Sequence, residues 1–351
     1  MSLLIYGAYG YTGQLITERA VDAGLTPIVA GRDRAKTTNL AHKYGLEHRV
    51  FSLDDPTAVA RALESASVVL HCAGPFVNTA QPMVAACIQT GTHYLDITGE
   101  IDVFEALAAQ NDAAEEAGIT LLPGVGFDVV PTDSVAAHLA ERMPDAHTLD
   151  IAFMGLGRVS QGTLRTAISQ MGSGGVVRRE GALQTVPPGW TTRTVDFGED
   201  GPGQRTVISI PWGDVATAYR STDIPNITTY TYLPKTPRTL LKWSRYLQWL
   251  LQLPVVQQLL DRWVDQLPPG PSAEERERGR SFVWGSVRNA AGDEAITRLT
   301  APEGYTFTAH AAVSAAQHTL NGDAAPGYQT PSTAFGPDFA LEIDGVSRHD
   351  V

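Results

Sequence analysis

The stretch GAYGYTG, Gly7–Gly13, places three glycines at intervals of three residues near the start of the chain. The residues LLIY before it are typical of a short buried strand, and GQLITERAVDAG, which begins at Gly13, carries apolar residues at helical spacing. Two interpretations fit a glycine-rich turn between a strand and a helix. Either the turn is only tight, or its backbone has to approach the phosphates of a ligand closely.

Further strands and helices follow this turn in regular alternation. Helical patterns of roughly 10–15 residues separate the segments that we expect to be strands, namely 2–6, 26–32, 48–53, 67–76, 92–98 and 119–128. This alternation predicts an α/β fold with a doubly wound parallel sheet of the Rossmann type. Ligands bind such sheets beyond the carboxyl ends of the strands. The loops that leave the strands therefore hold the candidate site residues.

The context of the glycine-rich loop favours a dinucleotide as its ligand, because a strand precedes it, a helix follows it and further βα units come behind it. Gly7 permits the tight turn, Gly10 lets the backbone approach a pyrophosphate, and Gly13 lets the helix pack close to the strand. The spacing is GxxGxxG rather than GxGxxG, a variant that is compatible with the same geometry. The residues expected to bind the cofactor in this loop are Gly7, Tyr9, Gly10, Tyr11, Thr12 and Gly13.

The end of the second strand indicates which dinucleotide is bound. An NAD site usually has an acidic residue there, which accepts hydrogen bonds from the ribose hydroxyls. This chain has Arg32 instead, and the planar guanidinium group is suited to a 2′-phosphate. Asp33 argues against this assignment, but it lies beyond Arg32 in the loop. We expect NADP as the cofactor, with solvated charges at the start of a helix as the alternative interpretation.

The fourth strand runs into a Gly-Pro turn. Such a turn at the mouth of a strand should contact the ribose or the nicotinamide end of the cofactor. The residues expected to do so are Ala73, Gly74, Pro75 and Phe76.

The candidate catalytic residues are Tyr94, Asp96 and Asp128, which lie where the fifth and sixth strands end. Strand alternation puts Tyr94 and Asp96 on the same face. Tyr94 could donate a proton, and a buried Asp96 or Asp128 could orient it or act as an acid with a raised pKa. Each residue also has a structural explanation, since Tyr94 could belong to the core and Asp96 could cap the following turn.

Short-chain dehydrogenases can also have a loop like GAYGYTG, but they need a Tyr-x-x-x-Lys pair, and no tyrosine of this chain has a lysine four residues later. A different family accounts for motifs along nearly the whole chain: VVLHCAGPF (68–76), HYLDITGE (93–100), PGVGFDVVPTD (123–133), GDVATAYRSTDIPNI (213–227), RSFVWGSVRNAAGDEA (280–295) and GYQTPSTAFGPDFAL (327–341). Together with GAYGYTG, these blocks resemble the saccharopine dehydrogenase-like oxidoreductases. The resemblance is greatest to the group that includes the trans-acting enoyl reductases of lipid biosynthesis.

The resemblance implies two domains. Residues 1–132, completed by 308–351, would form the NADP-binding Rossmann domain, and 133–307 would form an inserted α+β domain for substrate binding and dimerisation. Short segments rich in Thr, Val, Ile and Tyr between 191 and 233 agree with an antiparallel sheet in the insertion. We expect a homodimer.

The resemblance also implies an NADP(H)-dependent oxidoreductase that transfers a hydride to or from a C=C, C=O or C=N bond. The substrate would be a small metabolite, and a lipophilic one fits the relatives. The family does not define the substrate further, because its members reduce imines, enoyl groups and other acceptors. The alternative is a non-catalytic NADP(H)-binding sensor or a lipid-surface-associated protein that has the fold without the chemistry.

Composition excludes several other classes of protein. The formal net charge is -12, and an acidic surface repels phosphate backbones, so nucleic acid is not expected as a partner. Cys72 and Cys87 lie in apolar surroundings, which fits reduced thiols, and the histidines lack metal-ligand spacing, so no metal site is expected. We see no secretion signal and no apolar run near the ~20 residues of a membrane span, and so expect a cytoplasmic protein.

The segment 239–268 is not explained by a nucleotide-binding domain. It contains Trp243, Trp249 and Trp263, and its apolar residues follow helical spacing on both sides of Pro254. Two amphipathic helices hinged at this proline could pack on the sheet or on a second subunit. They could also form an apolar lid or a membrane-facing surface for a long-chain substrate, which makes peripheral membrane contact a further expectation.

Overall fold

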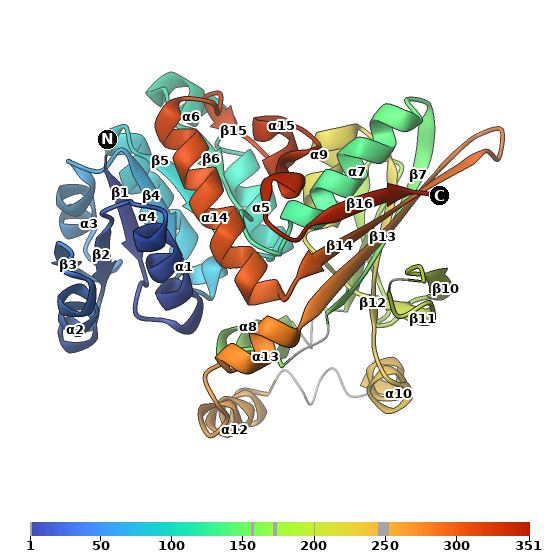
Figure 1. Cartoon of the computed structure of the whole chain (residues 1–351), viewed down its shortest axis with the longest axis horizontal. Helices are drawn as coiled ribbons and strands as arrows, with labels where there is room; N and C mark the ends of the chain where they lie inside the picture. The colour runs from blue at the N-terminus through green and yellow to red at the C-terminus, as the bar shows by residue number, and fades with distance from the viewer. Residues whose placement is uncertain (1, 156–157, 171–173, 200, 245–252) are drawn as a thin grey trace. The chain divides into compact units, whose positions relative to one another are not determined.

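The computed structural model describes residues 2–155, 158–170, 174–199, 201–244 and 253–351 (Figure 1). The chain divides into two compact units. The first unit consists of Met1–Val130 and Tyr305–Ile343, and the second unit consists of Pro131–Gly304 and Asp344–Val351.

The first unit is built on a seven-stranded sheet in which every strand pair is parallel. The strand order is β15-β6-β5-β4-β1-β2-β3. The strands are β1 (Leu3–Tyr6), β2 (Ile28–Gly31), β3 (His48–Val50), β4 (Val68–His71), β5 (His93–Asp96), β6 (Thr120–Leu122) and β15 (Gly327–Tyr328). The order reverses between β1 and β4, and dinucleotides bind at such a switch point. The predicted doubly wound parallel sheet is confirmed.

Helices connect these strands and cover the sheet, as Figure 1 shows. They are α1 (Tyr11–Asp22), α2 (Arg34–Tyr44), α3 (Pro56–Leu63), α4 (Phe76–Thr90), α5 (Ile101–Ala108), α6 (Asn111–Ala117), α14 (Gly304–Asn321), α15 (Pro331–Phe335) and the 3-10 turn η1 (Phe339–Glu342). Local sequence explains several of their ends. The side chain of Asp55 caps α3, which has Pro56 in its first turn, and α4 ends at Gly91 in the left-handed conformation.

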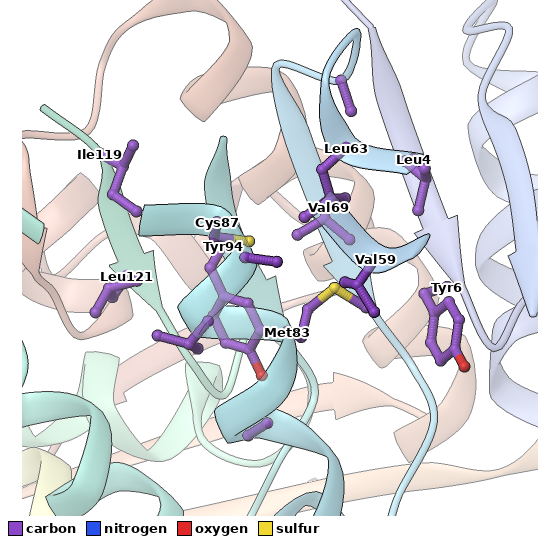
Figure 2. Packing of buried hydrophobic residues seen from close by; sticks show 14 of the residues in the cluster. Leu4, Tyr6, Val59, Leu63, Val69, Met83, Cys87, Tyr94, Ile119 and Leu121 are labelled. Carbon is purple, nitrogen blue, oxygen red and sulfur yellow. The ribbon is translucent and has the colours of Figure 1, made fainter. Parts of the chain in front are cut away.

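A core of apolar side chains lies between one face of this sheet and the helices α3 and α4 (Figure 2). Alternate residues of the strands supply the sheet side, which includes Leu4, Tyr6, Val69, Tyr94 and Leu121. The helices supply Val59, Leu63, Met83 and Cys87. All four residues of β1 and of β4 are buried, as expected for strands covered on both faces. Cys72 and Cys87 are free thiols.

In the residues that the structure describes, the second unit contains a nine-stranded mixed sheet. Its strands are β7 (Ala146–Gly155), β8 (Gly175–Arg179), β9 (Ala182–Val186), β10 (Thr192–Asp196), β11 (Gln204–Ser209), β12 (Asn226–Tyr232), β13 (Arg280–Asn289), β14 (Glu294–Pro302) and β16 (Ser347–Asp350). All pairs are antiparallel except β7 with β12. The expected antiparallel sheet is therefore present, with one parallel pair at its centre.

Six helices accompany this sheet in the described part of the unit: α7 (Val130–Arg142), α8 (Gln161–Gln170), α9 (Asp214–Thr222), α10 (Lys235–Ser244), α12 (Pro254–Asp265) and α13 (Ala273–Arg278). Helix α7 packs closely on β13. A Cβ atom at Gly285 of β13 would lie 2.5 Å from a methyl carbon of Val135 and 2.7 Å from one of Leu139. Glycine at this position therefore lets the helix approach the sheet.

The end of the chain differs from the predicted division. The resemblance predicts that 308–351 complete the nucleotide-binding domain, but β16 pairs with β14 in the sheet of the second unit. Side chains hold this strand in place, since Asp350 accepts hydrogen bonds from Thr297, at 2.7 Å, and from Arg142, at 3.1 Å. The edge of β14 pairs with residues 347–350. Short-range sequence patterns do not reveal such a pairing, because the two strands are far apart along the chain.

Within the described ranges, no helix combines the length and the apolar character that crossing a membrane requires.

Candidate functional site

The glycine-rich loop of the first unit forms the predicted turn between β1 and α1. Gly7 has φ +78°, a conformation that favours glycine, and its N–H donates to the carbonyl of Ala30 at 2.8 Å. A Cβ atom at Gly13 would overlap the carbonyl oxygen of Gly7, so Gly13 lets the helix start against the turn. Gly10 is different, because its φ of -67° suits any residue and an added Cβ would meet only the Gly7 oxygen, at 3.2 Å. The turn itself thus demands Gly7 and Gly13 far more than Gly10.

The residues between these glycines line the start of α1. Tyr9 lies against the backbone of Gly31 at the end of β2, where a Cβ atom would overlap its ring. Tyr11 is the first residue of α1, and its ring packs edge to face on Tyr305, with centroids 5.2 Å apart. Thr12 follows in the first turn and is half-buried. The N-cap residue of this helix is a glycine without a capping side chain.

Arg32 and Asp33 follow β2 and have different surroundings. Asp33 is the N-cap of α2, and its carboxylate accepts the N–H of Lys36 at 3.0 Å, which lowers the pKa of Asp33. Lys36 also pairs with Asp33 at 3.6 Å, and its ammonium lies 5.7 Å from the centre of the Tyr9 ring. Arg32 is exposed and has no hydrogen bond or ion pair within the described ranges. The carboxylate of Asp33 thus caps α2, while the guanidinium group of Arg32 is available to bind a ligand.

The AGPF turn connects β4 with α4, and its Gly74–Pro75 peptide bond is cis. The hydroxyl of Thr79 lies within hydrogen-bond distance of the carbonyl oxygens of Ala73, at 2.7 Å, and Pro75, at 3.1 Å. His71 contacts the same hydroxyl through Nε2 at 3.0 Å, and burial lowers its pKa to about 3, so its imidazole is neutral. Side chains below the turn therefore hold its shape.

Glu100 reaches the same turn from the loop after β5. Its two carboxylate oxygens accept hydrogen bonds from the first two backbone amides of α4, those of Phe76 at 2.9 Å and Val77 at 2.7 Å. Glu100 is almost fully buried, and burial raises its pKa although the hydrogen bonds from the two backbone amides favour the charged form. The carboxylate of Glu100, from the loop after β5, therefore caps α4, the helix that follows β4.

Tyr94 and Asp96 lie on the same side of β5, as predicted, and both are fully buried. The Tyr94 hydroxyl donates to Oδ2 of Asp96 at 2.6 Å, while Oδ1 accepts the backbone N–H groups of Thr98 and Gly124, both at 2.9 Å. Burial raises the pKa of Asp96 to about 6 against the effect of these hydrogen bonds, and it raises that of Tyr94 well above 10. Asp96 thus joins the loops that leave β5 and β6.

Asp128 lies in the loop after β6, next to the loop after β5. A Cβ atom at Gly99 would be 2.6 Å from Oδ2 of Asp128, so the carboxyl group covers this glycine. Its Oδ1 is buried and has no hydrogen-bond partner among the described residues. Burial raises the pKa of Asp128 to about 8. The sequence pointed to Asp128 but not to Thr308, whose hydroxyl accepts the N–H of Phe127 at 3.0 Å. Phe127 and Thr308 are 181 positions apart, and no local sequence pattern connects them.

These loops bring most of the predicted site residues to one edge of the first unit's sheet. The glycine-rich loop, Arg32, the AGPF turn, Asp96 and Asp128 all follow the carboxyl ends of parallel strands. Their catalytic and cofactor-binding roles stay predictions. Among the described residues, no group of three or more His, Cys, Asp and Glu side chains is placed to hold a metal ion.

The segment 239–268 lies in the second unit and is described only in part. Trp249 falls in 245–252, outside the described residues. Helix α12 begins at Pro254, as the hinge at this residue predicted, and packs against α8. One side of it is apolar and exposed, with Val255, Leu259 and Trp263 having 67%, 59% and 52% of their surface accessible.

Comparison with known proteins supports the assignment of the first unit. Residues 3–122 match the family model described as saccharopine dehydrogenase NADP binding domain. Over 212 residues the chain is 27% identical to the saccharopine dehydrogenase-like oxidoreductase of Mus musculus, which covers 53% of this chain and 49% of that protein. It is 29% identical over 189 residues to the trans-acting enoyl reductase of Mycobacterium ulcerans, covering 50% of this chain and 42% of that protein. The chain spans about half the length of the curated relatives that it matches.

Two solved structures share the fold over the whole chain. Apo saccharopine dehydrogenase (L-Glu forming) of Saccharomyces cerevisiae has a TM-score of 0.68 at 13% identity, covering 100% of this chain and 99% of that one. The homospermidine synthase of Legionella pneumophila in complex with NAD has a TM-score of 0.66 at 10% identity, covering 100% and 91%. The predicted resemblance is confirmed. Residues 3–122 match an NADP-binding domain of the saccharopine dehydrogenase type, and the relatives from Mus musculus and Mycobacterium ulcerans are named an oxidoreductase and an enoyl reductase.

Proposed function

We propose that this protein is an NADP(H)-dependent oxidoreductase that transfers a hydride to or from a C=C, C=O or C=N bond of a small or lipophilic metabolite. One observation supports the choice of cofactor most directly. At the end of β2 the acidic residue, Asp33, caps α2, whereas Arg32 is exposed and unpaired within the described ranges. A ribose with a 2′-phosphate would find a bidentate cation there, and a ribose with a free 2′-hydroxyl would find no acceptor of the usual kind.

The residues present fit a dinucleotide along the edge of the sheet. Arg32 and Tyr9 would hold the adenosine end beside β2. The loop from Gly10 to Gly13 would receive the pyrophosphate, because Gly10 carries no side chain and α1 starts there without a side-chain cap. The AGPF turn after β4 would contact the nicotinamide end. When bound, NADPH supplies the hydride.

The chain's own groups prepare the nicotinamide end of the site. Thr79 and Glu100 fix the AGPF turn and the first turn of α4 through hydrogen bonds to backbone groups. Asp96 connects the neighbouring loops after β5 and β6. A cofactor ring would therefore meet loops that are already ordered, and rigid positioning of the reacting groups is the main contribution that a protein makes to hydride transfer.

A test of the cofactor compares Arg32→Ala with Arg34→Ala, which removes an exposed arginine two residues further along. Losing a charge-assisted hydrogen bond of about 1.5–3 kcal/mol should raise the Kd for NADPH by about ten- to a hundred-fold in Arg32→Ala. The Kd for NADH should change less than about two-fold, and Arg34→Ala should bind both cofactors nearly as the wild type does. Equal losses for NADPH and NADH in Arg32→Ala would contradict the 2′-phosphate contact.

Turnover distinguishes an enzyme from a non-catalytic sensor with the same fold. Purified protein is incubated with NADPH and a panel of enoyl, carbonyl and imine acceptors of increasing chain length, and oxidation is followed by absorbance. An oxidoreductase oxidises NADPH with at least one class of acceptor. Tight NADPH binding without turnover across the panel would favour the sensor.

A further inference from the structure

The loop Pro123–Val129, which carries Asp128, is held at three points. Its Gly124 N–H donates to the side chain of Asp96 at 2.9 Å, and its Val125 N–H donates to the carbonyl of Asp96 at 2.8 Å. The N–H of Phe127 donates to Thr308 of α14 at 3.0 Å. This small loop is thus tied to the end of β5 on one side and to a helix on the other. Asp128 is held at a defined place beside the end of the sheet.

The two oxygens of the Asp128 carboxyl group have different surroundings. The residue as a whole is half-buried, and Oδ2 packs over Gly99. Oδ1 is buried without a hydrogen-bond partner in the described part of the chain, although an unpaired carboxyl oxygen is costly. Asp96 and Glu100, in contrast, use their oxygens on backbone amides or on Tyr94. Of these three carboxyl groups, Asp128 is the one with a buried oxygen that has no hydrogen-bond partner among the described residues.

The strand-end loops beside Asp128 offer no positive charge to its ionised form. The strand-end loops 72–75, 97–100 and 123–129 contain no lysine, arginine or histidine. The ionisable side chains of the loop after β5 and of the end of β5 are Glu100 and Asp96, whose oxygens bind backbone amides and Tyr94. Helix α14 contributes the neutral hydroxyl of Thr308, which binds the N–H of Phe127. Burial in these surroundings raises the pKa of Asp128 to about 8, so its carboxyl group carries a proton at neutral pH.

The strand order shows which end of a dinucleotide this group would face. The Rossmann site is divided at β1, with β2 on the side where Arg32 would bind the adenosine end. β4, β5 and β6 lie on the other side, and Asp128 follows β6. A cofactor bound with its pyrophosphate at α1 extends its nicotinamide toward this second side.

We propose that Asp128 is the catalytic acid that delivers a proton to the substrate, and that Tyr94 and Asp96 are positioning residues that hold the loops around it. The inference rests on the proposed hydride-transfer function. In the reducing direction the acceptor carbon gains a hydride, which NADPH supplies with its two electrons as it becomes NADP+. The electron pair of the broken π bond moves to the partner atom, and that atom bonds the proton of the Asp128 carboxyl group. Asp128 is left as a carboxylate and regains a proton from water.

The test uses the two cofactors themselves and needs no substrate. The nicotinamide ring carries a positive charge in NADP+ and none in NADPH. If Asp128 lies beside this ring, its ionised form favours NADP+, so the ratio of Kd(NADP+) to Kd(NADPH) should fall on the order of ten-fold between pH 6.5 and pH 9. The 2′-phosphate is common to both cofactors and cancels in the ratio. Binding is measured by protein fluorescence or calorimetry.

Two variants assign the effect to a residue. Asp128→Asn keeps the shape of the side chain and should make the ratio independent of pH. Asp102→Asn removes an exposed carboxylate in the first turn of α5 and should leave the wild-type pH dependence. With an acceptor from the enzyme panel, Asp128→Asn should lower the rate on the order of a hundred-fold, the usual scale for losing a general acid. Its Kd for NADPH should change less than about two-fold.

Several outcomes would overturn the inference. A pH-independent ratio in the wild-type protein would show that Asp128 does not face the nicotinamide, and this measurement holds even if Asp128→Asn fails to fold. A pH-dependent ratio that persists in Asp128→Asn would assign the effect to another group. Wild-type protein that binds neither cofactor would instead refute the proposed function itself, and the inference with it, so the two failures are distinguishable.

Discussion

The Oε1 atom of Glu100 lies 2.9 Å from the backbone nitrogen of Phe76, the first residue of α4. This hydrogen bond joins the loop after β5 to the turn after β4, so two neighbouring strand ends share one capping group. A carboxylate at a helix N-terminus is stabilised by the unpaired amides and by the helix dipole. The helix behind the AGPF turn thus starts at a place set by the neighbouring loop.

We expect Glu100→Gln to destabilise this connection, because an amide cannot accept from both backbone N–H groups as a carboxylate does. The free energy of unfolding in urea should fall by about 1–3 kcal/mol, and the amide protons of Phe76 and Val77 should exchange faster. The control is Asp102→Asn, an exposed carboxylate close by in α5. If both variants unfold at the wild-type urea concentration, the cap contributes nothing to stability.

The glycine-rich loop allows fold and cofactor binding to be separated. Gly13→Ala puts a methyl group onto the carbonyl oxygen of Gly7 and should lower the free energy of unfolding by about 1–3 kcal/mol. Gly10→Ala requires only a small shift, since the added carbon lies 3.2 Å from the same oxygen. Gly10→Ala should therefore change stability by less than about 1 kcal/mol, yet weaken NADPH binding on the order of ten-fold or more. A Gly10→Ala variant with wild-type affinity would mean that the pyrophosphate does not approach this residue.

A histidine near the end of the first unit should make local stability depend on pH. His318 contacts Asp323 through Nδ1 at 2.7 Å and Glu342 of η1 through Nε2 at 2.9 Å. Burial alone would lower its pKa, but the hydrogen bonds to these two carboxylates outweigh burial and raise the pKa above 6.5.

A folded-state pKa above the unfolded value means that the folded protein binds the proton more tightly. The resulting stabilisation is complete below about pH 6.5 and is lost as the pH rises through the folded-state pKa of His318. Hydrogen exchange in Phe339–Glu342, corrected for the intrinsic effect of pH, should therefore speed up between pH 6 and pH 9 in the wild type. His318→Gln should remove this dependence, and the same corrected acceleration in both proteins would place its cause elsewhere.

The exposed apolar side of α12 should bind lipid surfaces if it serves as the expected membrane contact. Wild-type protein should co-sediment with phosphatidylcholine liposomes, and Leu259→Ser with Trp263→Ser should reduce the bound fraction by at least about half. Trp190→Ser is the control, since Trp190 is 54% exposed and lies outside α12. Two results together would identify α12 as a packing element. The wild-type protein would stay in the supernatant, and the double variant would lose only stability or a dimeric state.

The doubly wound sheet, the tight turn at Gly7 and the close helix start at Gly13 could all be predicted from the sequence, because each depends on residues near one another along the chain. The spacing of apolar residues predicts whether a segment is a strand or a helix, and a glycine indicates where the backbone can adopt a positive φ. The same local patterns predicted Arg32 at the end of β2 and the strand-end loops that are proposed to bind a dinucleotide. Seven motifs in their order along the chain carry the resemblance to the saccharopine dehydrogenase-like oxidoreductases.

Only the tertiary structure decided what the carboxylates of this edge do. Glu100, Asp96 and Asp128 look alike in sequence, but the first caps α4 and the second connects two loops. The third has a buried oxygen without a hydrogen-bond partner among the described residues. The contact of Phe127 with Thr308 and the pairing of β16 with β14 likewise join segments that are far apart in the chain. The charge state of a carboxyl group and the partner of a strand edge depend on which distant atoms exclude water from it, and local spacing does not encode that.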